Sequence, residues 1–334
     1  MQQLHLQPKQ CMESPNRAPR RLGVAVRVLG RDGLRSRDAR RPEHHPHLSI
    51  SLLYVRDILL YLAEQRIGCY RLADDLVPFQ DRYDSAQFAA ELEACRDILA
   101  EVGALARQHQ VRLTMHAGLH LSLAAPDAGI AQRSAEALVR RAALLGALGC
   151  GPDSVITLHV GGAHGDRAAA LERFAARFER LPHAVQRRLA LEPDEDSFAL
   201  EDLLRLHQQL GVPLIFDTLH YQIHNPSRIP PSAALSLALA TWPLGQRPKI
   251  HLSSQRTEAH LLPAQGRQGR RVLGPRLGQH ADFLNPFEVI AWLEAARGLP
   301  AFDMMLEAKA ADLALLRLRE DLARFAPEWA EVVS

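Results

Sequence analysis

The sequence predicts an α/β fold, a single TIM (β/α)8 barrel, from two observations. Strand-like apolar runs alternate with helix-like amphipathic runs along the 334 residues, with the spacing typical of successive βα units. Six of the apolar runs also stop on a side chain that binds metals or transfers protons: His116, His159, Glu192, Asp217, His251 and Glu307. Because parallel barrels carry their active sites at the carboxyl-terminal ends of the strands, we expect a metal site at that rim.

The expected strands and helices follow one another without an intervening linker. Apolar runs predict strands at residues 22–28, 68–72, 111–116, 155–159, 189–192, 212–217, 249–253 and 304–307. Apolar residues at helical spacing predict helices at residues 48–65, 85–108, 129–148, 166–181, 198–210, 232–240, 285–297 and 308–325. Gly211 is a suitable C-cap for the helix before it, and the charged, His-rich segment 31–46 is expected to be a loop. Eight such units predict one domain over residues 21–330, preceded by a flexible basic tail at residues 1–20.

Composition limits the class of protein and its partners. With 47% hydrophobic and 23% charged residues, the chain is typical of a soluble globular protein with a sizeable core. The net charge of +2 hides two basic segments: residues 1–46 hold ten Lys or Arg against four acids, and residues 256–276 hold five Arg against one acid. These segments suggest an anionic partner, and a solvated Arg-rich surface is the alternative. Scattered cysteines, no secretory signal and no run near the ~20 apolar residues of a membrane span favour a cytoplasmic protein without membrane contact.

Local patterns strengthen the expectation of a metal site. Asp217-Thr218-Leu219-His220 places a carboxylate and an imidazole three residues apart, as a metal site would; a helix-capping Asp beside a surface His is the alternative. Lys249 and His251 alternate along one strand, so both are expected to point into the barrel, unless Lys249 forms a salt bridge at the strand start. The glycines after His159 suit either close approach of a ligand or a tight turn. His280, after the second basic segment, is either a further imidazole of the site or a surface residue.

Together these positions provide more ligands than one metal ion needs. The candidate ligands are His116, His159, Glu192, Asp217, His220, His251, His280 and Glu307. A catalytic zinc uses three protein ligands, so a cluster of two or three divalent ions is a better fit. Such clusters hold the attacking hydroxide and neutralise the phosphate in phosphodiester hydrolysis. The basic segments would then hold a nucleic-acid backbone.

Short motifs run in a specific order and spacing through residues 21–318. They include Arg21-Leu-Gly23, Tyr70-Arg-Leu72, Leu76-Val-Pro78, Met115-His-Ala-Gly118, Leu158-His-Val-Gly-Gly162, Leu189-Ala-Leu-Glu-Pro-Asp194, Phe216-Asp-Thr-Leu-His220, Thr241-Trp242, Pro248-Lys-Ile-His-Leu-Ser-Ser254 and Asp303-Met-Met-Leu-Glu-Ala-Lys309. This set resembles the UV damage endonucleases, TIM-barrel DNA repair enzymes related in site design to endonuclease IV.

The resemblance implies a role for each candidate ligand and for one lysine. The eight ligands would hold two or three divalent ions, Mn²⁺ in the first place and Zn²⁺, Mg²⁺ or Co²⁺ as alternatives. Glu192, Lys249 and His251 would be the catalytic residues, and Lys249 matches a family lysine that can be carboxylated. The reaction implied is hydrolysis of the phosphodiester 5′ to a UV lesion, such as a pyrimidine dimer, a 6-4 photoproduct or an abasic site. It would leave a 3′-hydroxyl and a 5′-phosphate.

The resemblance also implies contacts with damaged double-stranded DNA, bound by a monomer associated with the nucleoid. Residues expected to probe the lesion are Leu119, His120, Asp75 and Tyr221, and residues expected to bind phosphates are Arg167, Arg256, Arg267, Arg270 and Arg271. Where the family usually has Pro-Gly-Gln and then Tyr or Phe, this chain has Ala117-Gly118-Leu119-His120. Leu119 can still act as an apolar wedge between bases, and His120 can stack.

The probe region departs from the family at further positions. Val24 and Val28 replace the usual Tyr and Asn of the first strand, Asp75 stands where some members have His, and Pro193 replaces an Asn beside Glu192. Two other functions therefore stay open at this point. One is a sugar isomerase on a related barrel, and the other is a DNA-distortion binder that has lost cleavage.

Overall fold

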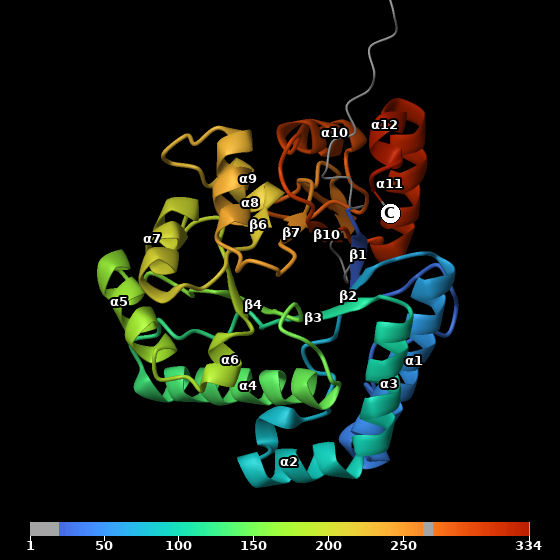
Figure 1. Ribbon diagram of the computed structural model, residues 1–334, viewed down its shortest axis with the longest axis vertical. Helices are drawn as coiled ribbons and strands as arrows, with labels where there is room; N and C mark the ends of the chain where they lie inside the picture. Colours follow the sequence, from blue (N-terminus) through green and yellow to red (C-terminus); the bar gives the residue numbers. More distant parts are fainter. Residues whose placement is uncertain (1–19, 263–269, 334) are drawn as a thin grey trace, which may run out of the picture.

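The fold is a ring of eight parallel strands surrounded by helices (Figure 1). The computed structural model describes residues 20–262 and 270–333. The ring strands are β1 (Leu22–Ala25), β2 (Cys69–Arg71), β3 (Arg112–His116), β4 (Ile156–His159), β5 (Leu189–Glu192), β6 (Phe216–Asp217), β7 (Lys249–Leu252) and β10 (Asp303–Leu306). Their spatial order is β5-β4-β3-β2-β1-β10-β7-β6. Leu191 in β5 pairs with Leu214 just before β6 and so brings the two ends of this sheet together. The predicted TIM-barrel class is confirmed.

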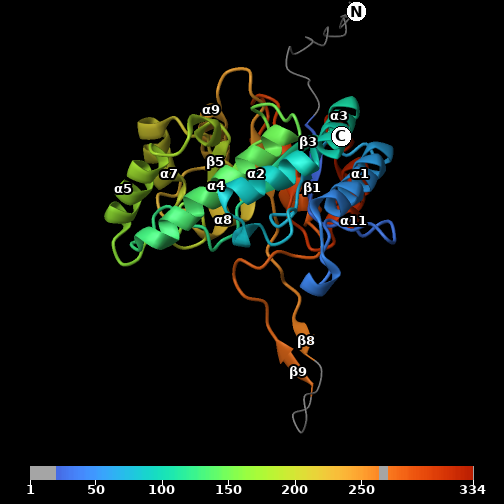
Figure 2. The same cartoon turned by 90° about the horizontal axis from the view of Figure 1, so that it is seen from below.

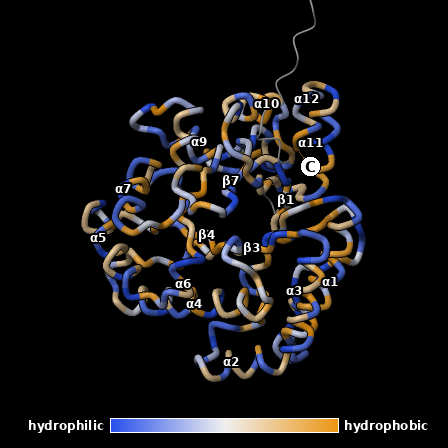
Figure 3. Tube along the Cα trace, in the orientation of Figure 1, coloured by the Kyte–Doolittle hydropathy of each residue, from blue (hydrophilic) through white to orange (hydrophobic). Residues whose placement is uncertain are grey.

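Helices cover the outside of the ring. They are α1 (Leu48–Glu64), α2 (Ser85–Ala94), α3 (Arg96–Gln108), α4 (Ala128–Ala147), α5 (Arg167–Phe178), α6 (His183–Gln186), α7 (Leu200–Leu210), α8 (Thr218–Ile223), α9 (Pro231–Ala240), α10 (Pro286–Ala295), α11 (Ala311–Phe325) and α12 (Pro327–Ala330). Short 3₁₀ turns lie at Pro42–His44 and Gln80–Arg82. Along the helices, hydrophobic and hydrophilic residues alternate (Figure 3), as expected for helices with one face on the core.

Several elements differ from the sequence prediction. The helix expected over residues 85–108 breaks at the buried Cys95, so that α2 packs on α4 while α3 packs on α1. The basic segment 256–276, for which no strand or helix was predicted, contains an antiparallel hairpin of β8 (His260–Leu262) and β9 (Arg271–Leu273) that projects from the barrel (Figure 2). The first strand ends at Ala25, because Val26 takes a left-handed backbone conformation with φ of 58°. Residues 1–19 of the predicted tail lie outside the described residues, and Arg20 is buried against the body of the protein.

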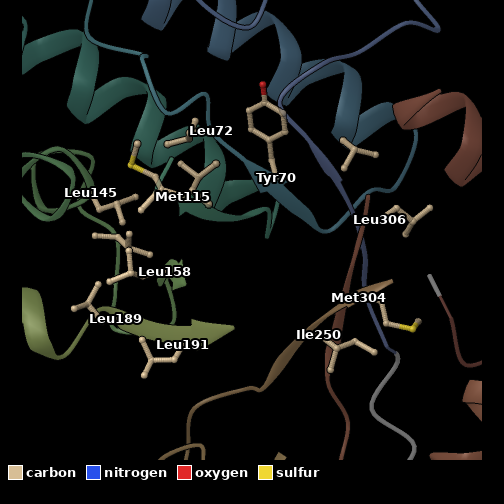
Figure 4. Close-up of a cluster of buried hydrophobic side chains, with 14 of the residues drawn as sticks. Tyr70, Leu72, Met115, Leu145, Leu158, Leu189, Leu191, Ile250, Met304 and Leu306 are labelled. Atoms are coloured by element: carbon tan, nitrogen blue, oxygen red, sulfur yellow. The ribbon is translucent and has the colours of Figure 1, made fainter. Parts of the chain in front are cut away.

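The core lies between the strands and the helices (Figure 4). Side chains alternate along each strand, so Ile250 faces the helices while its neighbours Lys249 and His251 face the barrel interior, all with 2% exposure or less. Leu158 on β4 is buried on the helix side in the same way. The alternation of side chains along each strand therefore places polar groups inside the barrel, while the layer between the strands and the helices stays apolar.

One carboxylate organises the amino-terminal end of the barrel. Asp303, at the start of β10, accepts hydrogen bonds of 2.8 and 2.7 Å from Arg21 and lies 2.9 Å from guanidinium nitrogens of both Arg112 and Arg247. Burial works to raise the pKa of Asp303, but the three guanidinium groups hold it below its usual range. Because these residues belong to four strands or their approaches, the cluster joins β1, β3, β7 and β10 at one end.

Replacing Asp303 with Asn should lower the free energy of unfolding by about 3–5 kcal/mol, since it removes a buried anion from three cations. Urea unfolding followed by circular dichroism measures the loss. The control Glu93→Gln breaks an exposed ion pair with Arg96 and should cost only about 0.2–1 kcal/mol. A loss for Asp303→Asn no larger than that of the control would contradict this role.

Candidate metal centre and nucleic-acid interface

The carboxyl-terminal ends of the strands meet in one cluster of imidazoles and carboxylates. Strand register sets the neighbours, because His159 pairs with Glu192 across β4 and β5, and Asp217 pairs with His251 across β6 and β7. The structure links all of the candidate ligands through contacts of 3.9 Å or less: His116, His159, Glu192, Asp217, His220, His251, His280 and Glu307.

The carboxylate of Glu192 lies at the centre of this cluster. Its Oε2 is 2.9 Å from Nε2 of His116 and 3.6 Å from Nε2 of His159. Its Oε1 is 2.7 Å from Nδ1 of His251 and 3.5 Å from Nδ1 of His220. Burial works to raise the pKa of Glu192, but the surrounding imidazoles hold it well below its usual range. Glu192 is therefore a buried anion that needs positive charge close to it.

Backbone carbonyls orient three of the imidazoles. Nδ1 of His116 lies 2.8 Å from the carbonyl oxygen of Ala117, and Nδ1 of His159 lies 3.1 Å from that of Glu192. Nδ1 of His220 lies 3.0 Å from the carbonyl oxygen of Pro193. A carbonyl only accepts hydrogen bonds, so in the neutral ring each Nδ1 carries the proton and Nε2 keeps its lone pair. In His116 that lone pair faces the anionic Oε2 of Glu192. Two acceptors at this distance call for a cation between or beside them, so these residues fit a divalent metal.

His251 is held differently from the other imidazoles. Its Nε2 is 2.9 Å from a guanidinium nitrogen of Arg71, which can only donate, so Nδ1 carries the proton towards Glu192 and Glu307. Burial lowers the pKa of His251 to about 3, and the ring is therefore neutral at physiological pH. In this arrangement His251 serves the cluster as a hydrogen-bond donor, and its role as a metal ligand stays a prediction.

Arg71 is a member of the cluster to which sequence reasoning assigned no role. It is largely buried, and besides its contact with His251 it forms an ion pair with Glu307. Burial works to raise the pKa of Glu307, but the Arg71 guanidinium lowers it. A charged residue at the end of the second strand was the available signal, the same strand-end pattern that indicated the ligands. Arginine is not a metal ligand, so a pattern of metal-binding side chains does not include it.

Asp217 both caps a helix and belongs to the cluster. Its Oδ1 accepts hydrogen bonds from the amides of Leu219 and His220 at the start of α8, while its Oδ2 accepts one of 3.0 Å from Ser253. Burial raises the pKa of Asp217 to about 6. Burial works to lower the pKa of His220, but Asp217 and Glu192 raise it to about 9. Half of the alternative interpretation was therefore correct: Asp217 is a cap, but His220 is buried rather than on the surface.

Groups of these ligands could hold metal ions. In each group, one atom from every residue lies within 4.8 Å of the others. The groups at the rim are His116 with His159 and Glu192, His116 with His251 and Glu307, and Glu192 with Asp217, His251 and Glu307. The groups share Glu192, His116, His251 and Glu307, as expected of neighbouring ions with bridging ligands. His280 lies at the edge, with Nε2 3.7 Å from Glu307.

Lys249 lies beneath the cluster, inside the barrel. It is fully buried, and its Nζ donates a hydrogen bond of 3.1 Å to the hydroxyl of Thr157 on β4. Within the described residues no acidic side chain forms an ion pair with it. Burial, together with the nearby guanidinium groups of Arg71 and Arg112, lowers the pKa of Lys249 to about 7. The amine is therefore close to half neutral at physiological pH.

The expected lesion-probing residues separate into two sets. Leu119 and His120 are exposed on the loop after β3, where the amide of Gly118 donates a 3.2 Å hydrogen bond to Asp74. Asp75, also exposed, pairs with Arg37 at 2.7 Å. Tyr221, by contrast, packs its ring against Phe216 and Trp292 and donates its hydroxyl to Ile229 O. The structure thus brings Leu119, His120 and Asp75 to the surface and gives Tyr221 a packing role.

The expected phosphate-binding arginines also differ in their surroundings. Arg167, at the start of α5, pairs with Asp202, and the largely buried Arg256 pairs with Asp282 at 2.8 Å. Arg270 and Arg271 are exposed at the hairpin. Arg267 lies outside the described residues. Of the described arginines in this set, only the two at the hairpin have no acidic partner in the structure.

The fold and cluster define a class of protein, a TIM barrel with a candidate metal centre at its carboxyl-terminal rim. Similar solved structures include SacUVDE, with a TM-score of 0.76, 24% identity, and coverage of 91% of this chain and 98% of that one. Endonuclease IV from Thermus thermophilus matches with a TM-score of 0.55 and 17% identity over 91% and 99% of the two chains. A 3-keto-D-glucoside 4-epimerase from E. coli matches with a TM-score of 0.54 and 12% identity, over 90% of this chain and 99% of that one. At these identities the likeness concerns the fold alone.

The sequence comparison is more specific. The chain belongs to the UV-endonuclease UvdE family, which matches residues 41–332. The UV DNA damage endonuclease of Bacillus velezensis is 29% identical over 266 residues, 79% of this chain and 77% of the relative. That of Halalkalibacterium halodurans is 30% identical over 263 residues, 78% and 76% of the two chains. The resemblance seen in the motifs is confirmed. No helix among the described residues is long and apolar enough to cross a membrane.

The lowered pKa of Lys249 should make the stability of the fold depend on pH. The folded protein loses this proton near pH 7, whereas the unfolded chain keeps it to about pH 10.4, so stability should rise with pH between these values. The free energy of unfolding of wild type, relative to that of Lys249→Met, should increase by close to about 1.4 kcal/mol per pH unit in this window. Chemical unfolding with chelator in buffers free of carbon dioxide measures it. The control is Lys309→Met at a partly exposed lysine, which should keep the rise of the free energy of unfolding with pH. If the free energy of unfolding of Lys249→Met rose with pH as steeply as that of wild type, the prediction would be refuted.

Proposed function

We propose that this protein is a metal-dependent endonuclease that acts in the repair of UV-damaged DNA. It hydrolyses the phosphodiester 5′ to pyrimidine dimers, 6-4 photoproducts or abasic sites and leaves a 3′-hydroxyl and a 5′-phosphate. It acts as a monomer on double-stranded DNA in the nucleoid. Membership of the UV-endonuclease UvdE family supports this proposal, and so do the relatives named UV DNA damage endonuclease.

The observation that carries the proposal is the carboxylate of Glu192 with four imidazoles around it at the barrel rim. Two or three divalent ions, in the first place Mn²⁺, would be held by the eight predicted ligands. When bound, they supply a hydroxide nucleophile and neutralise charge on the phosphate and the leaving oxygen. Glu192 orients the imidazoles, and the carbonyls behind His116 and His159 keep their Nε2 lone pairs available.

Lys249 and Arg71 adjust the charge beneath the cluster. A neutral Lys249 removes one positive charge from beside the metal ligands, and we propose that carboxylation turns it into an anion. A native mass higher than that of the sequence by one carbon dioxide would report this modification. Arg71 holds Glu307 and His251 in place through its ion pair and hydrogen bond. His251 donates a hydrogen bond from Nδ1 to Glu192 and so holds the central carboxylate in place, which supports its assignment as a catalytic residue.

The loops that follow the strands at the rim would recognise the damaged DNA. The exposed Leu119 would enter the helix at the lesion, and His120 would stack on a base. Damaged bases stack poorly, so distortion costs less energy at a lesion than in undamaged DNA. The exposed Arg270 and Arg271 would contact phosphates, while Arg167 and Arg256 would first have to leave their acidic partners.

Purified protein should nick UV-irradiated duplex DNA in the presence of Mn²⁺ and should stop when a chelator removes the metal. Glu192→Gln should lower the nicking rate more than about 100-fold, because it removes the central anion, yet should leave DNA binding largely intact. Denaturing gel electrophoresis measures nicking, and fluorescence anisotropy measures binding.

His183→Asn, an exposed imidazole on α6, is the matched control and should nick like wild type. Absence of nicking together with equal binding to damaged and undamaged duplex would refute the proposal. Selective binding without nicking would point instead to a cleavage-deficient distortion binder. Turnover of free ketoses without salt-dependent DNA binding would point to a sugar isomerase.

Leu119→Ala should reduce the preference for damaged over undamaged duplex about tenfold, because a wedge side chain accounts for a few kcal/mol of unstacking at most. Competition binding with irradiated and untreated duplexes measures the ratio. Leu244→Ala is the control, since Leu244 is fully exposed before β7, at the opposite end of the barrel. If Leu119→Ala kept both the ratio and the affinity of wild type, Leu119 would not be the probe.

A further inference from the structure

The loop that follows β1 forms a cavity lined by basic side chains. The cavity has a volume of about 620 Å³, and its lining combines Arg27, Arg35, Arg37, Arg40, Arg41 and His44 with the small or apolar residues Val28, Leu29, Leu34, Ser36 and Ala39. We propose that this arginine cavity binds backbone phosphates of the DNA strand that crosses the metal centre, an inference that rests on the proposed function. These arginines are distinct from those that the sequence pattern suggested for phosphate binding.

The arginine cavity carries more positive charge than its neighbours neutralise. Arg40 pairs with Asp38 at 2.7 Å, Arg37 pairs with Asp75 at 2.7 Å, and Arg41 is 3.9 Å from Glu43. In the described part of the chain, neither Arg27 nor Arg35 has an acidic side chain within ion-pair distance. Three carboxylates therefore face five guanidinium groups, and a chain of phosphates would supply the missing negative charge.

Buried anchors hold the loop in this shape. The amides of Leu29 and Gly30 donate hydrogen bonds of 2.7 and 2.9 Å to the fully buried carboxylate of Asp312, which also accepts one of 2.6 Å from Tyr61. A Cβ at Gly30 would lie 2.6 Å from Asp312, so this close approach needs glycine. The buried Asp38 accepts a hydrogen bond from the amide of His47 as well as those from Arg40. The cavity is thus formed before any ligand arrives, which lowers the entropic cost of binding.

The arginine cavity lies next to the metal centre. The amide of Val26, where the loop begins, donates a 2.9 Å hydrogen bond to the carbonyl of Arg71. Arg27 donates one of 3.3 Å to the carbonyl of Lys309, two residues after Glu307. Arg37 joins the loop to Asp75, on the segment after β2. A strand held with one phosphate at the metal centre would therefore pass its neighbouring phosphates across this cavity.

The test compares two double variants that each remove two exposed arginines. Arg35→Gln with Arg41→Gln removes two cations from the cavity, and Arg66→Gln with Arg187→Gln removes two that precede β2 and β5 at the opposite end of the barrel. DNA affinity is measured by fluorescence anisotropy over a range of salt concentrations, with damaged and undamaged duplex. The cavity variant should reduce the slope of log affinity against log salt by about 2, roughly one per phosphate contact, for both duplexes. The control variant should keep the slope of wild type.

Arg35→Lys with Arg41→Lys keeps the charge and should restore most of the slope, which separates charge from folding. A cavity variant with the slope of wild type would overturn the inference. So would calorimetry that finds saturable inorganic phosphate binding lost in the cavity variant while its DNA slope is unchanged. If wild type nicks DNA and the slope does not change, only this inference fails. If wild type does not nick but the slope falls, the proposed function fails and the DNA-binding cavity stands.

Discussion

A buried carboxylate must be surrounded by cations or hydrogen-bond donors, and the rim of this barrel is arranged around that requirement at Glu192. Four imidazoles reach it from β3, β4, α8 and β7, elements that are far apart in the sequence and adjacent only in the closed ring. The carbonyls behind His116 and His159 fix the tautomers of these two rings, which leaves their Nε2 lone pairs directed at Glu192. The arrangement is electrostatically complete only with added positive charge, and this is the physical reason to expect metal ions there.

The two ends of the barrel use charge in opposite ways. At the amino-terminal end, Asp303 is neutralised by three arginines, so that cluster is complete and acts on stability. At the carboxyl-terminal end, the carboxylates of Glu192, Asp217 and Glu307 outnumber the cations there, which are Arg71 and His220, whose pKa is raised to about 9. Lys249 lies between the two ends with a depressed pKa. This division agrees with the general rule that one end of such barrels maintains the fold and the other carries the chemistry.

The barrel alone does not decide what the protein does, since an epimerase and a nuclease share it at similar TM-scores. Family membership and the residues above the rim are more informative. The exposed Leu119 and His120, the hairpin of β8 and β9, and the arginine cavity all lie on loops that follow strands at the same end. These loops carry several exposed basic side chains, which agrees with the DNA substrate proposed for this chain.

Local patterns in the sequence were sufficient to predict the parallel barrel and the positions of most strands and to propose six of the eight candidate ligands, because strand period and strand-end residues are properties of short segments. Tertiary structure alone decided the break at Cys95, the inward turn of Tyr221, the pairing of Arg256 with Asp282 and the place of Arg71 beside Glu307. Each of these depends on which segments become neighbours when the ring closes. The burial of a side chain and the charge that faces it are set by residues distant in sequence. A local sequence pattern does not show which of these residues become neighbours in the folded chain.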